Sequence, residues 1–277
     1  MKAYLDQNIW ELAVAHLPAT DLTAWVNGAD VHLCLGTHNV YEFGRCFLDC
    51  ASRQTVERGR SIFAYLLALE GIYFLRPTEQ LIDSDLVFAR TGARPLPLLD
   101  ALNVAATREE MARLSLGFAD RAREYVASRE TEIAAFNPRY RDSILERNKG
   151  VSIPKEFVQL RDDYALRRSL LDVDRLPLLQ GLSDELLFSH PERLPFFNSW
   201  INAQIYLNYV AVTNPVGPSK KSTSDFRHVI DSGAADCFVT NDRTLARATA
   251  VLSPWQTVYD WQRFRGSVDD GTALPEA

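Results

Sequence analysis

The sequence predicts an α/β fold in which a central parallel sheet lies between two layers of helices. Short apolar runs alternate with helical periodicity at both ends of the chain, and strands separated by helices usually pair in parallel. A chain of 277 residues with 47% hydrophobic content can bury a sizeable core. Between the two ends lies a long helical pattern, which we expect to be an insertion.

The first part of the chain alternates between strand and helix patterns. We expect strands at 2–6, 31–36 and 72–75 and helices at 8–16, 39–50 and 55–70. Arg76-Pro77 closes the third strand, because proline lacks the N–H that a strand ladder needs. Gly92, Pro95 and Pro97 interrupt the next stretch. Residues 1–99 therefore form the first part of the α/β domain.

The middle of the chain has a different character. Helical periodicity dominates residues 100–213, with breaks at Asn137-Pro138, at 150–154 and at His190-Pro191. Its basic and acidic residues are nearly balanced, which is typical of solvated helix faces with ion pairs one turn apart. We interpret 100–213 as a large helical insertion, and a basic stripe that faces RNA stays open as an alternative.

The last part returns to alternation and completes the sheet. We expect a helix at 225–232, a strand at 237–240, a helix at 243–250 and a strand at 256–259. Residues 214–264 are thus the closing part of the α/β domain. Residues 265–277 contain Gly, Asp and Pro, and we expect them to form a flexible tail.

Composition excludes several classes of protein. No apolar run reaches the roughly 20 residues of a membrane span, and no signal-peptide pattern is visible, so we expect a cytoplasmic protein without a membrane partner. The four cysteines lack zinc-site spacing, and we assign them no disulfide or structural metal. The net charge of −6 argues against a broad non-specific grip on nucleic acid, which must therefore be held locally.

Four acidic residues carry the functional signal, because each stands where a strand gives way to a loop or helix: Asp6, Glu42, Asp225 and Asp242. A carboxylate beside a buried strand is costly to desolvate and seldom serves packing. Ligands of parallel sheets bind beyond the carboxyl ends of the strands, where Asp6 and Asp242 would lie. Hard cations such as Mg²⁺ and Mn²⁺ prefer oxygen ligands. The pattern therefore indicates a shared metal site and metal-dependent phosphodiester chemistry.

The candidates for substrate binding are polar residues near these acids in the sequence: Asn8, His228, Thr240, Asn241, Lys220 and Lys221. His228 is one helical turn from Asp225, so it could contact phosphate or hold the carboxylate, and a structural histidine is equally open. The two lysines stand in a predicted loop, where they could contact a phosphate backbone or simply be exposed.

Each of the four acids also has a structural alternative. Asp6, Asp225 and Asp242 stand next to the expected start of a helix, where each could be the N-cap. Glu42 could be a solvated helix position. The order and spacing of the four together favour the shared site over these separate roles.

These residues resemble those of the PIN-domain nucleases, a group of metal-dependent ribonucleases that includes the VapC toxins. The most specific stretch is Asp-x-x-His followed by Ala-Asp-x-Phe-Val-Thr-x-Asp, which ends at Asp242. The resemblance covers roughly residues 1–80 and 220–262. It implies a three-layer α/β/α PIN-like domain in which the four acids are both catalytic residues and ligands of Mg²⁺ or Mn²⁺. The long insertion departs from the compact toxins.

The expected function is that of an endoribonuclease in which a metal-activated water hydrolyses RNA phosphodiester bonds, with Asp6 as the central ligand. RNA is the expected substrate, and an antitoxin or other protein partner and a homodimer stay open. A second class is a catalytically silent PIN-like module that binds RNA or protein. A third is an aspartate-nucleophile phosphatase, but Asn8 stands where that enzyme would need a second Asp.

Overall fold

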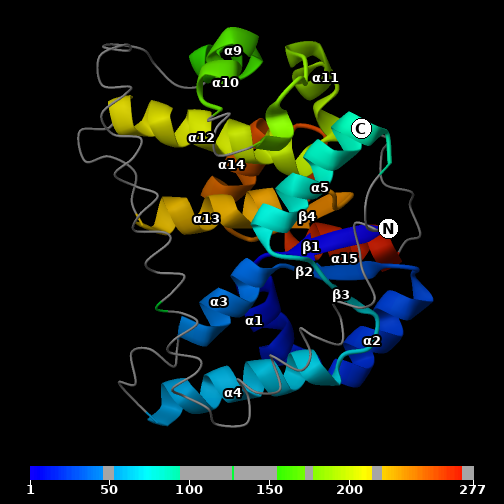
Figure 1. The fold of residues 1–277 in the computed structure, drawn as a ribbon. Helices are drawn as coiled ribbons and strands as arrows, with labels where there is room; N and C mark the ends of the chain where they lie inside the picture. The colour runs from blue at the N-terminus through cyan, green and yellow to red at the C-terminus, as the bar shows by residue number, and fades with distance from the viewer. Residues whose placement is uncertain (46–52, 94–126, 128–154, 172–176, 214–219, 270–277) are drawn as a thin grey trace.

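One sheet of five parallel strands forms the centre of the molecule (Figure 1). The structure is a computed structural model, and it describes residues 1–45, 53–93, 127, 155–171, 177–213 and 220–269. The strands are β1 (Lys2–Leu5), β2 (His32–Leu35), β3 (Ile72–Phe74), β4 (Cys237–Val239) and β5 (Thr257–Tyr259). All five predicted strands are present, and the predicted α/β class with a central parallel sheet is confirmed.

The strand β1 lies in the middle of the sheet, whose order is β3-β2-β1-β4-β5. The chain builds outward from β1 to β2 and β3, and then returns to the other side of β1 to add β4 and β5. The carboxyl ends of β1 and β4 are therefore neighbours at the point where the strand order reverses. This is where open parallel sheets bind ligands.

Helices cover the face of the sheet that carries Ala3 and Leu5 (Figure 1). They are α1 (Gln7–His16), α2 (Ala19–Gly28), α4 (Arg53–Ala68) and α15 (Trp261–Asp269). Their apolar residues recur at helical spacing and are buried against the strands. Trp25 of α2 packs edge-on against Trp261 and Phe264 of α15, with ring centroids 6.0 and 5.8 Å apart, so the two helices support each other.

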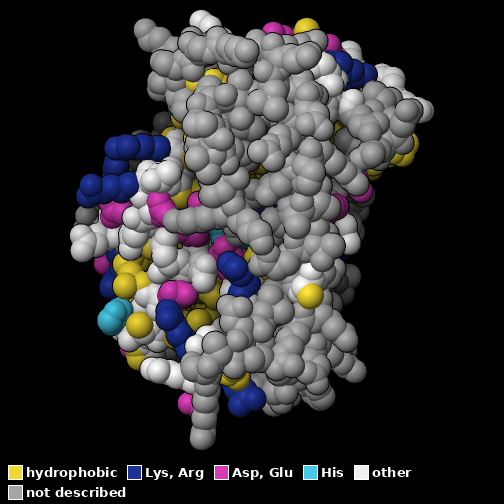
Figure 2. Space-filling model, turned by 90° about the vertical axis from the view of Figure 1, so that its left-hand side faces the viewer, with side chains coloured by type: hydrophobic (Ala, Val, Ile, Leu, Met, Phe, Trp, Pro, Cys, Tyr) yellow, Lys and Arg dark blue, Asp and Glu magenta, His cyan; other side chains and the backbone are white. Residues whose placement is uncertain are grey.

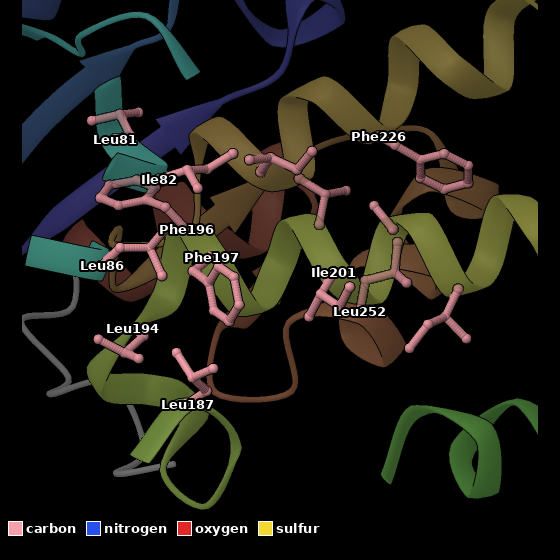
Figure 3. Close-up of a cluster of buried hydrophobic side chains, with 14 of the residues drawn as sticks. Leu81, Ile82, Leu86, Leu187, Leu194, Phe196, Phe197, Ile201, Phe226 and Leu252 are labelled. Atoms are coloured by element: carbon pink, nitrogen blue, oxygen red, sulfur yellow. The ribbon is translucent and has the colours of Figure 1, made fainter. Parts of the chain in front are cut away.

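A second core lies on the opposite face, to which Tyr4 of β1 and Phe238 of β4 point. Its helices are α5 (Thr78–Thr91), α12 (Pro195–Thr213), α13 (Lys220–Asp231) and α14 (Arg243–Leu252). Figure 3 shows how side chains of these four helices and of α11 meet in one apolar cluster. Both faces of the sheet are thus covered by helices, as its predominantly apolar strands require.

Three short helices lie outside α12: α9 (Lys155–Asp162), α10 (Tyr164–Ser169) and α11 (Asp184–Phe188) (Figure 1). Two single 3₁₀ turns, Pro177–Leu179 and Pro191–Arg193, accompany them. Phe157 of α9 and Leu187 of α11 are buried in the second core. The helix α3 (Thr37–Gly44) follows β2 and lies against α13 and α4.

The described part of the predicted insertion is helical and shares a core with the sheet. Phe196 and Phe197 of α12 are fully buried in the cluster that also contains Tyr4 and Phe238. A carboxylate oxygen of Asp85 in α5 accepts a hydrogen bond from the Phe197 amide at 2.9 Å. This bond caps the first turn of α12 from a neighbouring helix.

Several predicted boundaries are wrong. The helix α13 begins at Lys220, so Lys220 and Lys221 lie in its first turn rather than in a loop, and Asp225 lies inside the helix rather than at its start. A flexible tail was predicted at 265–277, but α15 continues to Asp269, so residues 265–269 are helical, and residues 270–277 lie outside the described part of the chain. The extension of α15 has a tertiary cause, since Val268 packs against the first core and Asp269 accepts a hydrogen bond from the Trp25 indole at 2.7 Å.

The helices α2 and α5 were not expected from the sequence. Gly92 breaks this stretch as predicted, because it ends α5 in the left-handed conformation with φ of 73°, a common helix terminus. The helix predicted at 39–50 ends at Gly44, and positions 46–50 with Cys46 and Cys50 lie outside the described residues. Among the helices that the structure describes, none is long and apolar enough to span a membrane.

Candidate functional site

The candidate site lies where the parallel strands end. Asp6 directly follows β1, and Thr240, Asn241 and Asp242 follow β4. Glu42 comes from α3, which begins after β2, and His228 comes from α13. Because the strands are parallel, these segments meet at one edge of the sheet. Figure 2 looks onto this end of the molecule, where several acidic side chains lie among the described residues.

The carboxylate of Asp6 is held by three hydrogen bonds. Its Oδ1 accepts from the Gln7 amide at 2.7 Å, and its Oδ2 accepts from the Thr240 hydroxyl at 2.8 Å and from the Asn8 side-chain amide. The Asn8 oxygen in turn accepts from the Asn241 amide at 3.2 Å. Asp6 is 5% exposed. The structure therefore gathers three of the predicted site residues, Asn8, Thr240 and Asn241, around the oriented carboxylate of Asp6.

The imidazole of His228 lies between two acids. Its Nε2 is 2.8 Å from Oε2 of Glu42 and 3.7 Å from Oδ1 of Asp6. Its Nδ1 is 2.9 Å from the hydroxyl of Tyr4, which points to this face from the middle of β1. His38, one turn before Glu42 on α3, places its Nε2 3.6 Å from the other Glu42 oxygen. Asp6, His38, Glu42 and His228 form what we call the acid–histidine cluster.

The charges within this cluster are set by its burial and its pairing. Burial alone would lower the pKa of His228, but the charge and hydrogen bond of Glu42, assisted by Asp6 and Asp231, raise it above its ordinary value. Burial alone would raise the pKa of Glu42, but His228 and His38 bring it well below its usual range. Burial lowers the pKa of His38 to about 4 against the hydrogen bond of Glu42. At neutral pH His228 is therefore the cation between two carboxylates, and His38 is neutral.

Buried polar contacts fix α3 and α13 around the cluster. The Asn39 side chain accepts from the Gly36 amide at 2.9 Å and donates to the Leu5 carbonyl at 3.2 Å, which ties α3 to the end of β1. Asp231 of α13 accepts from the His38 amide at 3.3 Å and from the Thr78 hydroxyl at 2.6 Å. Burial raises the pKa of Asp231.

The four predicted acids are brought together only in part. Asp242 is the N-cap of α14, since its Oδ1 accepts from the amides of Thr244 and Leu245 at 2.8 and 3.1 Å. Its own amide donates to the Thr240 hydroxyl at 3.0 Å, so Thr240 links it to Asp6. Both roles considered for Asp6 and Asp242, cap and site residue, are therefore compatible in one structure.

Asp225, Lys220 and Lys221 are predicted site residues that do not belong to the acid–histidine cluster. Asp225 lies one turn before His228 on α13 and is partly exposed. Lys220 and Lys221 lie at the start of the same helix, and the structure describes no side chain for them. Within the described residues, the group of three metal-ligating side chains whose ligand atoms all lie within 4.8 Å of one another is His38, Glu42 and His228.

The donor set fits some divalent cations better than others. Two imidazoles and one carboxylate, with an oxygen of Asp6 close by, suit Zn²⁺ or Mn²⁺, whereas Mg²⁺ takes oxygen ligands almost exclusively. His38 was not among the predicted site residues. The signal that could have identified it is its spacing of four residues from Glu42, which places both side chains on one face of a helix.

Comparison of the chain with protein-family models, curated proteins and solved structures finds no match in any of the three. The likeness to PIN-domain nucleases therefore remains an interpretation of the residues themselves. What the structure establishes is the parallel α/β architecture and a buried acid–histidine cluster at the carboxyl edge of its central strands.

Proposed function

We propose that the protein is a metal-dependent endoribonuclease whose active centre is the acid–histidine cluster. The observation that carries the proposal is the approach of Asp6 and Glu42, from two different elements, to a single nitrogen of His228 at 3.7 and 2.8 Å. Two carboxylates that approach one group from different elements need a cation between them, and we propose that a divalent metal ion takes over this role from the protonated His228. Their position at the reversal of strand order is where a substrate would bind.

Asp6, Glu42, His228 and His38 would hold the divalent cation. When bound, such a cation lowers the pKa of its water and neutralises charge on a phosphate. His228 at neutral pH supplies one positive charge to the cluster and must release its proton to become a ligand. The hydrogen bonds from Thr240 and Asn8 keep the Asp6 carboxylate oriented, as the partners of metal ligands commonly do.

The charge distribution on the edge of the sheet bears on how RNA would be held. In Figure 2 the described Lys and Arg side chains are interspersed with Asp and Glu, and they do not form one continuous basic field on this face. With a net charge of −6 for the chain, RNA binding would depend on local contacts near the cluster. Asn241, which is exposed beside Asp6, is a candidate for such a contact.

A second candidate function rests on how enclosed the cluster is. His228 is 1% exposed and Asp6 5%, and His228 already neutralises part of the acidic charge. A cluster of this kind can also serve as a buried structural network. The corresponding function is a catalytically silent PIN-like module that binds RNA or a protein.

The test is cleavage of a labelled pool of single-stranded and tRNA-like RNAs in Mn²⁺, Mg²⁺, Zn²⁺ or EDTA. We expect wild-type protein to cleave with Mn²⁺ or Zn²⁺ and to lose activity in EDTA. Asp6→Asn and Glu42→Gln should each lower the cleavage rate by roughly 100-fold or more, as removal of a directly acting group does. Asp21→Asn, which changes an exposed acid on α2, is the matched control.

The outcomes separate the two candidates. Cleavage that persists in Asp6→Asn would show that the cluster is not the active centre. RNA binding by wild type without cleavage in any metal would favour the silent module. Folding of each variant is checked by circular dichroism, so that loss of structure is not taken for loss of chemistry.

A further inference from the structure

A pocket on the far side of the molecule has no part in the proposed nuclease function. It has a volume of about 370 Å³ and is lined by Arg161, Tyr164, Arg167, Phe188, Asn202 and Trp255, among others. These residues come from α9 to α12 and from the segment just before β5. Since Trp255 precedes the start of a parallel strand, the pocket lies toward the amino edge of the sheet, opposite the acid–histidine cluster.

Arg167 gives the pocket its charge. The side chain is 3% exposed, and its terminal nitrogens donate to the Arg161 carbonyl at 2.9 Å and to the Asn198 side-chain oxygen. Among the described residues, its Nε has no hydrogen-bond partner and Arg167 forms no ion pair with a carboxylate. Burial lowers the pKa of Arg167 to about 10, so it remains a cation at neutral pH. A buried and only partly compensated guanidinium is costly unless an anion joins it.

The other charges around the pocket compensate Arg167 only in part, because burial lowers its pKa despite the attraction of Asp162. Asp162 is the acidic residue in the lining, and it is exposed and paired with Arg161 at 2.8 Å. Asn202 donates its amide to the Leu252 carbonyl at 2.7 Å, and within the described part of the chain its buried Oδ1 has no hydrogen-bond partner. The wall of the pocket thus contains a buried cationic donor and a buried neutral acceptor, each with an unsatisfied atom that a ligand reaches once these side chains turn toward it.

Aromatic rings form the rest of the wall. The guanidinium of Arg167 lies 4.5 Å from the centre of the Phe188 ring, and Tyr164 packs against the same ring with centroids 5.5 Å apart. Trp255, whose Nε1 donates to the Gly233 carbonyl at 3.0 Å, is held on the other side of the lining. Flat apolar surfaces beside a buried arginine suit a ligand that joins a planar ring to an anionic group.

We infer that this pocket binds a nucleoside monophosphate. The phosphate would accept from Arg167 and from Arg161, where it would displace the exposed Asp162 carboxylate, and a donor on the base edge would reach Asn202. The base would lie against the partly exposed Tyr164 and Trp255, because Arg167 and Phe197 already pack on the Phe188 ring. A volume of about 370 Å³ is within the range of roughly 300 to 1,000 Å³ that is usual for small-molecule sites. The inference does not depend on the nuclease function, because the two sites share no residue.

The experiment is calorimetric titration of the full chain, in EDTA so that no metal site contributes. The ligands are AMP, UMP, ribose 5-phosphate and inorganic phosphate. We expect saturable binding of one nucleotide per chain, and at least about tenfold weaker binding of ribose 5-phosphate and phosphate, because these lack the ring. Equal affinity for AMP and inorganic phosphate, or no saturable binding of any nucleotide, would overturn the inference.

Two variants locate the binding. Arg167→Gln should weaken AMP binding by roughly tenfold or more, because it removes a hydrogen bond between two charged groups. Arg167 also donates to Asn198 and to the Arg161 carbonyl, so Arg167→Gln disturbs the fold as well as the pocket. Arg161→Gln is therefore measured as a variant with a smaller structural effect, and we expect it to weaken AMP binding too. Arg168→Gln removes the same charge from a position outside the lining and should leave the affinity unchanged. Wild-type affinity in folded Arg161→Gln and Arg167→Gln would refute the site.

Discussion

Gly36 shows at the scale of one residue how tightly the acid–histidine cluster is built. It lies between β2 and α3, and a Cβ at this position would come within 2.5 Å of Asp231 Oδ2 and 2.9 Å of the Tyr4 hydroxyl. Asp231 and Tyr4 are both fully buried, so neither can move aside freely. The absence of a side chain at Gly36 is therefore what lets α13 approach the end of β2.

The substitution Gly36→Ala tests this closeness. We expect it to destabilise the protein by about 1–3 kcal/mol, because overpacking forces buried neighbours out of position. Urea unfolding followed by circular dichroism measures the change. The matched control is Gly28→Ala in α2, where an added Cβ meets nothing within 4 Å. We expect this variant to raise the free energy of unfolding by roughly 0.5–1 kcal/mol, because alanine loses less backbone entropy than glycine on folding. An equal change in the free energy of unfolding in the two variants would contradict the proposed packing around Gly36.

At the scale of elements, the start of α14 combines a structural and a chemical role in Asp242. The residue caps the helix through two backbone amides and is joined to Asp6 through Thr240. A sequence pattern cannot separate these roles, since Asp is a preferred N-cap as well as a metal ligand. Substitutions that keep one role and remove the other can distinguish them.

The variants Asp242→Asn and Asp242→Ala separate capping from catalysis. Asparagine caps about as well as aspartate, so Asp242→Asn should retain wild-type stability, whereas Asp242→Ala should lose about 1 kcal/mol. Under the proposed nuclease function, both should lower cleavage by roughly 10- to 100-fold, because both remove the charge next to Asp6. Thermal melting and the RNA cleavage assay are measured on the same preparations. Full activity in Asp242→Asn would confine Asp242 to its capping role.

At the scale of the whole molecule, the described part of the middle segment is not a separate layer. The helix α12 lies between α5, α13 and α14 and buries its phenylalanines in the core shared with Tyr4 and Phe238 (Figure 3). Tryptophan fluorescence follows the unfolding of both faces of the sheet, because Trp10 lies in one core and Trp200 packs against the other. Both cores pack on the same central strands, so we expect that unfolding of either core destabilises the whole sheet.

This shared core predicts a single unfolding transition. Urea unfolding monitored by tryptophan fluorescence and by far-ultraviolet circular dichroism should coincide. Phe197→Ala, in the first turn of α12, should lower the stability seen by both probes by about 3–5 kcal/mol. Leu186→Ala, at a side chain 44% exposed, is the control and should have little effect. Two separate transitions, with only one of them shifted by Phe197→Ala, would show that the middle segment folds independently.

The sequence by itself determined the strands and the class of fold, because strand patterns and the helices between them are local signals. It also proposed Asp6, Glu42 and His228 as site candidates, since each stands at a recognisable place after a strand or on a helix, and their function stays a prediction. It could not show that α13 begins at Lys220, nor that α15 continues to Asp269, because contacts with the first core and with Trp25 stabilise the last turn of α15.

Only the tertiary structure decided which of these residues meet. His38 and Glu42 are neighbours in sequence, but His228 is 186 residues from Glu42 along the chain, and no local pattern encodes a 2.8 Å contact between them. That contact depends on Gly36, Asn39 and Asp231, which bring α3 and α13 to the end of β1. Part of the cluster, Asp6, Glu42 and His228, was therefore among the candidates read from the chain, and His38 was not. The geometry of the cluster and the charge of its histidines arise from packing, because burial and pairing set both.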